Sequence, residues 1–176
     1  MLITREELAL RKITVDRTYP AGEFDDHAYE YHQSAPLRVQ AAAELLNSDI
    51  RIRGLLTTRL GIECDRCTAK MELPVEQGFD VFYRPVAAMA REGETEVPND
   101  ELEVGFYSGA GVELADLMKE QVILALPMKR VCRPDCRGLC PVCGSNLNIK
   151  TCECRQAASS ESPFAAKLIE VGRRQR

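Results

Sequence analysis

Residues 49–64, DIRIRGLLTTRLGIEC, decide the fold class, because their apolar and charged side chains alternate. Isoleucine and leucine recur at even positions from Ile50 to Ile62, while arginine, aspartate and glutamate stand at odd positions. A period of two belongs to a β-strand with one face in a core and the other in solvent. The segment therefore predicts a long, half-buried strand that ends at Cys64.

Two neighbouring segments repeat this alternation. Residues 37–45 precede the strand across the turn Asn47-Ser48-Asp49, and residues 73–83 follow it after a polar stretch. Three such strands with short connections form an antiparallel meander most simply, and residues 13–19 are a fourth candidate. The sequence thus predicts an antiparallel sheet, arranged as a meander or a partly closed barrel.

One helix is expected after the sheet. In residues 112–127, VELADLMKEQVILALP, apolar side chains recur at helical spacing up to Pro127, which stops the helix. Its apolar face is expected to cover the sheet, which makes the fold class α+β. Ser162-Pro163 predicts the start of a short second helix near the end of the chain, and residues 87–103 an acidic surface loop.

Composition and charge divide the chain into two parts. It has 176 residues, a net charge of −4, no apolar run long enough to span a membrane, and no export-signal pattern at its start. We therefore expect a cytoplasmic protein without a membrane partner. Residues 1–128 carry 13 basic and 23 acidic side chains, whereas residues 129–176 carry 10 and 4. We predict a sheet-plus-helix domain at 1–128 and a basic, cysteine-rich tail at 129–176.

The eight cysteines are the main chemical clue, because a reducing cytosol disfavours disulfides. They are Cys64, Cys67, Cys132, Cys136, Cys140, Cys143, Cys152 and Cys154. Four thiolates form a closed tetrahedral zinc site, so eight make two sites. Short loops close at least entropic cost, which favours a local site of the last four cysteines. The first four would then join the 64–67 hairpin to the tail. The competing partition combines the two CxxC pairs, Cys64/Cys67 with Cys140/Cys143.

Structural zinc fits this pattern best. An iron–sulfur cluster also takes four thiolates, but the CPVCG turn is more typical of zinc. A redox CxxC would stand before a helix, whereas Cys64 and Cys67 stand between strands. A closed four-sulfur site has no open position for a substrate, and the sequence lacks GxSxG, Walker and glycine-rich phosphate motifs. We therefore expect a non-enzyme with no small-molecule substrate, two structural zinc ions and a zinc-ribbon-like tail.

The motifs ECDRC (63–67), GLCPVCGSNLN (138–148) and CEC (152–154), with the LP that ends the helix, resemble the YceD family of large ribosomal RNA subunit accumulation proteins. In this resemblance Cys64 and Cys67 match the first cysteine pair of the family, and Cys140 and Cys143 match its knuckle. The resemblance implies a bacterial cytoplasmic protein, with plastid relatives, that acts in accumulation or processing of 23S rRNA and in large-subunit assembly. It implies no enzymatic activity.

The basic tail indicates how such a protein would contact RNA. Five cations lie among the cysteines, where a rigid scaffold would present them to phosphates: Lys129, Arg130, Arg133, Arg137 and Lys150. Few aromatic side chains accompany them, which favours backbone recognition over base stacking. The alternative is an adaptor that binds a large-subunit ribosomal protein and makes no direct RNA contact.

Overall fold

The computed structural model describes residues 1–86 and 104–156 of the chain. The acidic loop expected at 87–103 and the helix expected from Ser162 lie outside these residues. The chain divides into two compact units. Unit 1 comprises Met1–Ile62 and Met71–Met128, and unit 2 comprises Glu63–Lys70 and Lys129–Arg176.

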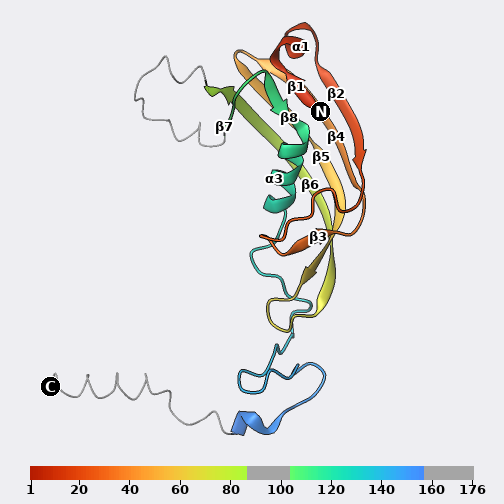
Figure 1. The fold of residues 1–176 in the computed structure, drawn as a ribbon, viewed down its shortest axis with the longest axis vertical. Coiled ribbons are helices and arrows are strands. Elements are labelled where there is room, and N and C mark those ends of the chain that lie inside the picture. Colours follow the sequence, from red (N-terminus) through yellow and green to blue (C-terminus); the bar gives the residue numbers. More distant parts are fainter. Residues whose placement is uncertain (87–103, 157–176) are drawn as a thin grey trace, which may run out of the picture. The chain divides into compact units, whose positions relative to one another are not determined.

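The alternating segments form the main sheet of unit 1 (Figure 1). Its strands β2 (Ile13–Tyr19), β4 (Leu37–Leu46), β5 (Asp49–Glu63) and β6 (Lys70–Pro85) are neighbours in that order. β2 and β5 both pair antiparallel with β4, with Val39 opposite Leu56. The connection from β5 to β6 is too short for a parallel crossover. These strands confirm the expected meander and its fourth member.

One edge of the sheet differs from the expectation of a purely antiparallel arrangement. β7 (Val104–Tyr107) pairs parallel with β6, in register Phe82 with Val104. Eighteen residues separate the two strands, which is enough for the return path that parallel pairing requires. In the described part of the chain the end strands β2 and β7 do not pair with each other, so the sheet is open rather than closed as a barrel.

Three strands of three residues each were not expected. β3 (Tyr31–Gln33) pairs with the last part of β5, and β1 (Leu2–Thr4) pairs with β8 (Gly111–Glu113) in a separate small sheet. Such strands are too short for a period to emerge from the sequence. The β1–β8 pair positions the start of the helix that follows, since the Leu114 amide donates to the Met1 carbonyl at 2.9 Å.

Two α-helices occur in the described residues, where the sequence analysis expected one. α3 (Leu114–Leu124) is the expected helix, and it ends three residues before Pro127. α1 (Arg5–Leu10) begins at Thr4, whose hydroxyl oxygen accepts from the Glu7 amide at 3.3 Å. Neither helix has the length and apolar character needed to cross a bilayer.

The core of unit 1 lies between the inner face of the sheet and α3 (Figure 1). Most even-numbered residues of β5 and most odd-numbered residues of β4 are buried there, together with one side of α3. Its largest fully buried side chains include Leu56, Leu60, Leu114 and Met118. A continuous hydrocarbon core of this kind is the main stabilising contribution to unit 1.

Unit 2 has little regular structure in its described residues. Its tail contains an isolated antiparallel bridge between Leu139 and Asn146 and a 3-10 turn, η2 (Glu153–Gln156). The zinc-ribbon-like form of the tail therefore stays a prediction. With so few backbone ladders, the conformation of unit 2 depends on turns and on its cysteines.

Candidate metal centres

The turn between β5 and β6 brings Cys64 and Cys67 together. The Cys64 amide donates to the Ala69 carbonyl at 3.0 Å, and the Thr68 amide donates to the Cys64 carbonyl at 2.9 Å. Thr68 adopts a positive φ of 56°, which closes the turn. Both cysteine side chains are almost fully buried, with exposed fractions of 1% and 3%. The turn thus supplies two converging thiols.

The beginning of the tail forms hydrogen bonds with this turn. The Asp65 amide donates to the Arg130 carbonyl at 2.8 Å, and the Arg130 amide donates to a carboxylate oxygen of Asp65 at 2.6 Å. Two residues further on, the Cys132 amide donates to the Cys64 sulfur at 3.3 Å. An N–H···S bond of this kind favours the thiolate form of the sulfur.

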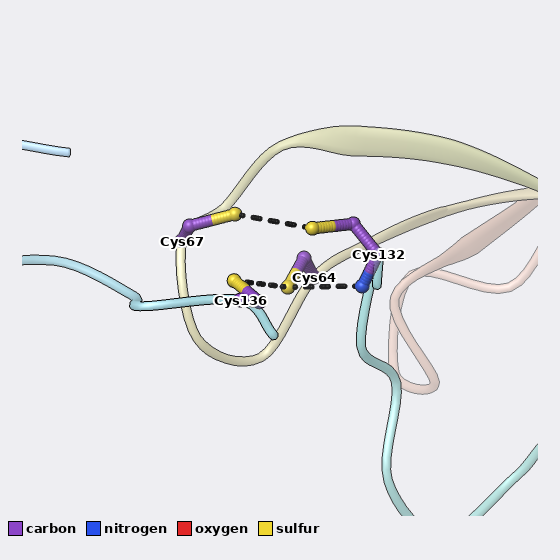
Figure 2. Close-up of side chains that lie close together, drawn as sticks. All are labelled: Cys64, Cys67, Cys132 and Cys136. Atoms are coloured by element: carbon purple, nitrogen blue, oxygen red, sulfur yellow. Dashed lines mark hydrogen bonds between the residues drawn. The ribbon is translucent and has the colours of Figure 1, made fainter. Parts of the chain in front are cut away.

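Cys64, Cys67, Cys132 and Cys136 form the first four-sulfur set, which we call the interlocked centre (Figure 2). The sulfur atoms of Cys64 and Cys136 are 3.9 Å apart, and those of Cys67 and Cys132 are 3.7 Å apart. Four sulfurs at about 2.3 Å from a tetrahedral ion are separated by about 3.8 Å. A disulfide would need about 2 Å. The geometry therefore fits a shared metal ion rather than oxidised pairs.

Cys140, Cys143, Cys152 and Cys154 form the second set, which we call the local centre. The Gly144 amide donates to the Cys140 carbonyl at 2.9 Å, and the Cys140 amide donates to the Ser145 carbonyl at 2.8 Å. Gly144 has a φ of 70°, which glycine adopts without strain. Within each centre all four sulfurs lie within 4.8 Å of one another. The structure thus brings the cysteines together as in the first grouping, not as in the competing one.

The two centres differ in exposure. In the interlocked centre only Cys132 is exposed, whereas in the local centre Cys143 is exposed and Cys152 and Cys154 are half-buried. The interlocked centre joins segments that are 64 residues apart, and the local centre spans fifteen residues of one segment. Solvent therefore reaches the local centre more readily.

Crowding of the four sulfurs opposes ionisation of all four thiols at once. Burial raises the pKa of Cys64, but hydrogen bonds from the backbone amides of Cys132, Arg66 and Cys67 outweigh it and bring the pKa to about 6. Burial and the Cys136 sulfur raise the pKa of Cys132 to about 12. Four thiolates around one point repel one another, and a divalent metal ion removes that repulsion. Each centre can therefore hold a thiophilic ion.

In the local centre, too, one cysteine has a lowered pKa and another a raised pKa. The hydrogen bond with Ser145 lowers the pKa of Cys143 to about 6, and the Cys140 sulfur and burial raise the pKa of Cys152 to about 12. The Ser145 hydroxyl oxygen lies 3.3 Å from the Cys143 sulfur. A hydroxyl at this distance can donate to a metal-bound thiolate and fix its orientation.

The basic residues named from the sequence all lie in unit 2 but differ in their surroundings. Lys129, Arg137 and Lys150 are exposed, and their side chains form no ion pair with the rest of the described chain. Arg133 is exposed but lies 3.4 Å from the Asp135 carboxylate, and Arg130 is half-buried beside Asp65 at 3.8 Å. The first three are thus the most available for an anionic partner.

Two residues of this region were not singled out from the sequence. The exposed Arg66 guanidinium donates to the Cys136 carbonyl at 2.9 Å, so a cation stands beside the interlocked centre. Its position inside the ECDRC motif was the available signal. Asn148 donates from its amide nitrogen to the Cys136 sulfur at 3.4 Å. No spacing rule links Asn148 to a cysteine twelve positions earlier.

An open sheet followed by a unit with two four-cysteine centres defines a class of protein that could bind two metal ions. Comparison with known proteins then shows the family to which the chain belongs. The family model described as "Large ribosomal RNA subunit accumulation protein YceD" matches residues 52–168, two thirds of the chain. The chain belongs to the YceD family.

Individual relatives agree with this assignment. An uncharacterised protein of Mycobacterium tuberculosis is 30% identical over 140 residues, which cover 79% of this chain and 63% of the relative. The maize chloroplast protein named as a homologue of the large ribosomal RNA subunit accumulation protein is 23% identical over 143 residues, 68% of this chain and 49% of that protein. The chain spans about 60% of the length of the mycobacterial relatives it matches. No solved structure matches it.

Proposed function

We propose that this chain is a non-enzymatic cytoplasmic factor for the accumulation or processing of 23S rRNA and for assembly of the large ribosomal subunit. Two structural zinc ions stabilise unit 2, one in each four-cysteine centre. The exposed basic side chains of unit 2 then contact phosphates of the rRNA or its precursor. The family description and the plant relatives' names supply the process, and the site supplies the chemistry.

The observation that supports this proposal most directly is that exposed Lys and Arg side chains belong to the same unit as the two four-cysteine centres. Arg66, Lys129, Arg137 and Lys150 are exposed and belong to the same unit as both centres. Most protein–nucleic acid hydrogen bonds go to the phosphate and sugar backbone, and Lys and Arg supply many of them. A metal-stabilised unit would hold these cations in fixed positions without a hydrocarbon core.

Zinc suits the two centres because four thiolates form closed tetrahedral sites with no open position for a reacting molecule. Iron also accepts four thiolates, and analysis of the metal content of the purified protein distinguishes the two. A closed site argues for a structural role. For this reason we propose no catalytic residue.

A second candidate function, an adaptor for a ribosomal protein, is favoured by charge and exposed apolar groups. Residues 63–70 and 129–176 carry twelve basic and six acidic side chains, and two zinc ions with eight thiolates contribute −4, which leaves about +2. Val142 and Ile149 are 62% and 82% exposed in the same unit. A nearly neutral unit with exposed apolar side chains could bind protein instead of RNA.

Salt dependence of binding separates the two functions. Full-length protein with its metal is titrated with fragments of precursor 23S rRNA between 50 and 200 mM salt, alone and with Lys129, Arg137 and Lys150 replaced by Gln. Each phosphate contact contributes about 0.7 to 0.9 to the slope of log affinity against log salt. We therefore expect the triple variant to bind more weakly, with a slope lower by about 2.

The matched control replaces three exposed arginines of unit 1, Arg17, Arg53 and Arg59, by Gln. It should retain the affinity and slope of the unsubstituted protein. Equal effects of the two triple variants would contradict a role for unit 2 in RNA binding. Absence of RNA affinity together with salt-insensitive binding of a ribosomal protein would support the adaptor function instead.

A further inference from the structure

Asn148 contacts one centre although it belongs to the loop of the other. It lies between Cys143 and Cys152, two members of the local centre. Its side-chain amide nitrogen nevertheless donates to the sulfur of Cys136, a member of the interlocked centre. A single side chain therefore joins the two sets of sulfurs.

The orientation of Asn148 is fixed by several further hydrogen bonds. Its side-chain oxygen accepts from the Arg137 amide at 2.8 Å and from the Arg133 guanidinium at 3.0 Å. Its backbone amide and its side-chain nitrogen both donate to the side-chain oxygen of Asn146 at 2.9 Å. Because the Asn148 side-chain oxygen accepts from both Arg133 and Arg137, the Asn148 side-chain nitrogen faces the Cys136 sulfur.

Backbone contacts join the same two segments. The Leu147 amide donates to the Gly138 carbonyl at 2.9 Å, and Leu139 and Asn146 form an antiparallel bridge. The segment that carries Cys136 is thus held against the loop between Cys143 and Cys152. The conformation of that loop depends on the local centre, because the cysteines at both ends belong to it.

We propose that Asn148 is a positioning residue for Cys136 and that it couples the two centres. Metal in the local centre orders the loop, the ordered loop directs the Asn148 N–H to the Cys136 sulfur, and this bond raises the metal affinity of the interlocked centre. A donor to a ligand sulfur disperses the thiolate charge and fixes the direction of the sulfur. The inference rests on the metal binding proposed above.

The coupling acts in both directions, because the effect of one bound ligand on another is reciprocal. Metal in the interlocked centre therefore also favours metal in the local centre. The expected behaviour is cooperative loading, with few molecules that hold an ion in the interlocked centre alone.

The first test replaces Asn148 by Asp in the full-length protein loaded with two zinc ions. Asp keeps a side-chain oxygen that accepts from Arg133 and Arg137 but replaces the N–H that faces Cys136 by an anionic oxygen. Loss of an outer partner of a metal ligand typically costs 10- to 100-fold in metal affinity. We expect the interlocked centre to release zinc to a chromophoric chelator 10- to 100-fold faster, with alkylation and mass spectrometry identifying which cysteines become free.

Two controls distinguish positioning from general damage. Asn47→Asp makes the same chemical change in a turn of unit 1 and should leave zinc release unchanged. With Co²⁺ in place of zinc, loss of the N–H···S bond should shift the sulfur-to-cobalt charge-transfer band to longer wavelength, an effect that a merely less stable fold would not produce. Asn148→Ala serves as a second variant if the Asp variant does not fold.

The second test addresses the coupling itself. The double variant Cys152→Ser, Cys154→Ser removes the local centre but keeps every ligand of the interlocked one. We expect its interlocked centre to bind zinc at least 10-fold more weakly, and Asn148→Asp to add little in that background. Additive effects of the two changes, or unchanged release from Asn148→Asp, would overturn the coupling while the two-zinc proposal stands. Purified protein without metal would overturn both.

Discussion

The two units bury different kinds of atom. The core of unit 1 consists of aliphatic and aromatic side chains from the sheet and α3. In the described part of unit 2 the buried apolar side chains are all cysteines, namely Cys64, Cys67, Cys136 and Cys140, while Val142 and Ile149 are exposed. A unit of this size rarely buries enough hydrocarbon to fold alone. Unit 1 is therefore stabilised mainly by the hydrophobic effect, and we expect unit 2 to depend on bound metal.

Metal removal should give the largest difference between the units. A structural zinc ion in a small zinc-finger peptide contributes about 10–16 kcal/mol of apparent binding free energy at pH 7, which is folding free energy when no other core exists. After chelation we expect amides of unit 2, such as those of Cys140 and Leu147, to lose their protection from hydrogen exchange. Amides of β4 and β5 should keep theirs, as measured by exchange and mass spectrometry.

Re-addition of zinc is the control for this experiment and should restore the protection of unit 2. Unchanged protection in residues 63–70 and 129–156 after verified metal removal would contradict the dependence of unit 2 on metal. It would mean that hydrogen bonds and turns suffice to hold unit 2. Loss of protection in both units together would mean that the core of unit 1 is not independent.

Acid should give the next largest difference, because the two units should unfold at different pH values. Each zinc ion displaces up to four protons, so its apparent affinity falls by up to about four decades per pH unit below the thiol pKa. In unit 1 the hydrogen bond from Arg51 lowers the pKa of Asp80, and that from Arg38 lowers the pKa of Asp16. A carboxyl group with a lowered pKa stabilises the folded state above its ordinary pKa of 3.8, and this contribution is lost as the pH falls through and below that value.

We therefore expect two steps in a titration from pH 8 to 3. Zinc release and loss of unit 2 come first, followed by loss of unit 1 below about pH 4. Zinc release is measured by a chromophoric chelator, and the sheet by circular dichroism. Asp80→Asn should change only the second step. A single transition that combines zinc release with loss of the sheet would contradict the independence of the units.

A core substitution should affect unit 1 alone. Leu56 is fully buried, and Leu56→Ala should cost about 2–5 kcal/mol of the free energy of unfolding. The matched control is the neighbouring Leu55, which is 38% exposed on the other face of β5, so Leu55→Ala should cost far less. Urea melts followed by circular dichroism measure both changes.

The zinc content of both variants in the absence of urea should remain two ions per chain, because neither side chain belongs to unit 2. A Leu56→Ala protein that is folded but has lost one zinc ion would show that the core of unit 1 supports a metal centre. That result would replace two independent units by one cooperative molecule.

The sequence predicted the regular parts of the fold because they carry long periodic patterns. The alternation in residues 37–45, 49–64 and 73–83 is confirmed as β4, β5 and β6, and the apolar spacing before Pro127 as α3. The three-residue strands were not predicted, since two apolar positions make no period. α1 was missed although Thr4 and Glu7 have the spacing of a capping box. The parallel pairing of β7 depends on a long connection that leaves no local signal.

In the candidate site, too, some features could be predicted from the sequence and others could not. Cysteine spacing and the cost of closing loops favoured the two sets that the structure brings together, but the competing partition that combines the two CxxC pairs stayed open until the structure separated them. Arg66 and Asn148 lie inside the motifs ECDRC and GLCPVCGSNLN, but their contacts with Cys136 could not be predicted, because those contacts arise where separate segments meet. A sequence indicates ligands by their chemical type, whereas an ordinary asparagine or arginine gains a role only through its neighbours.

Two glycines of unit 2 give the smallest expected effects. Gly138 and Gly144 have φ values of 75° and 70°, so Ala at either position costs about 1–2 kcal/mol. A Cβ at Gly138 would also lie 2.9 Å from the Arg66 carbonyl oxygen, whereas at Gly144 it would meet nothing within 4 Å. Since the Leu139 amide donates to that same carbonyl, Gly138→Ala should loosen the contact between turn and tail.

Zinc-release rates from the two variants measure this difference, and Gly138→Ala should release zinc from the interlocked centre faster than Gly144→Ala. Gly109→Ala is the control in unit 1. Gly109 has a φ of 79°, and a Cβ there would meet nothing within 4 Å, as at Gly144. It should lower the urea midpoint of the sheet and leave zinc release unchanged. Equal release from Gly138→Ala and Gly144→Ala would mean that the thiolates alone, and not the close packing of the tail on the 64–67 turn, hold the interlocked centre together.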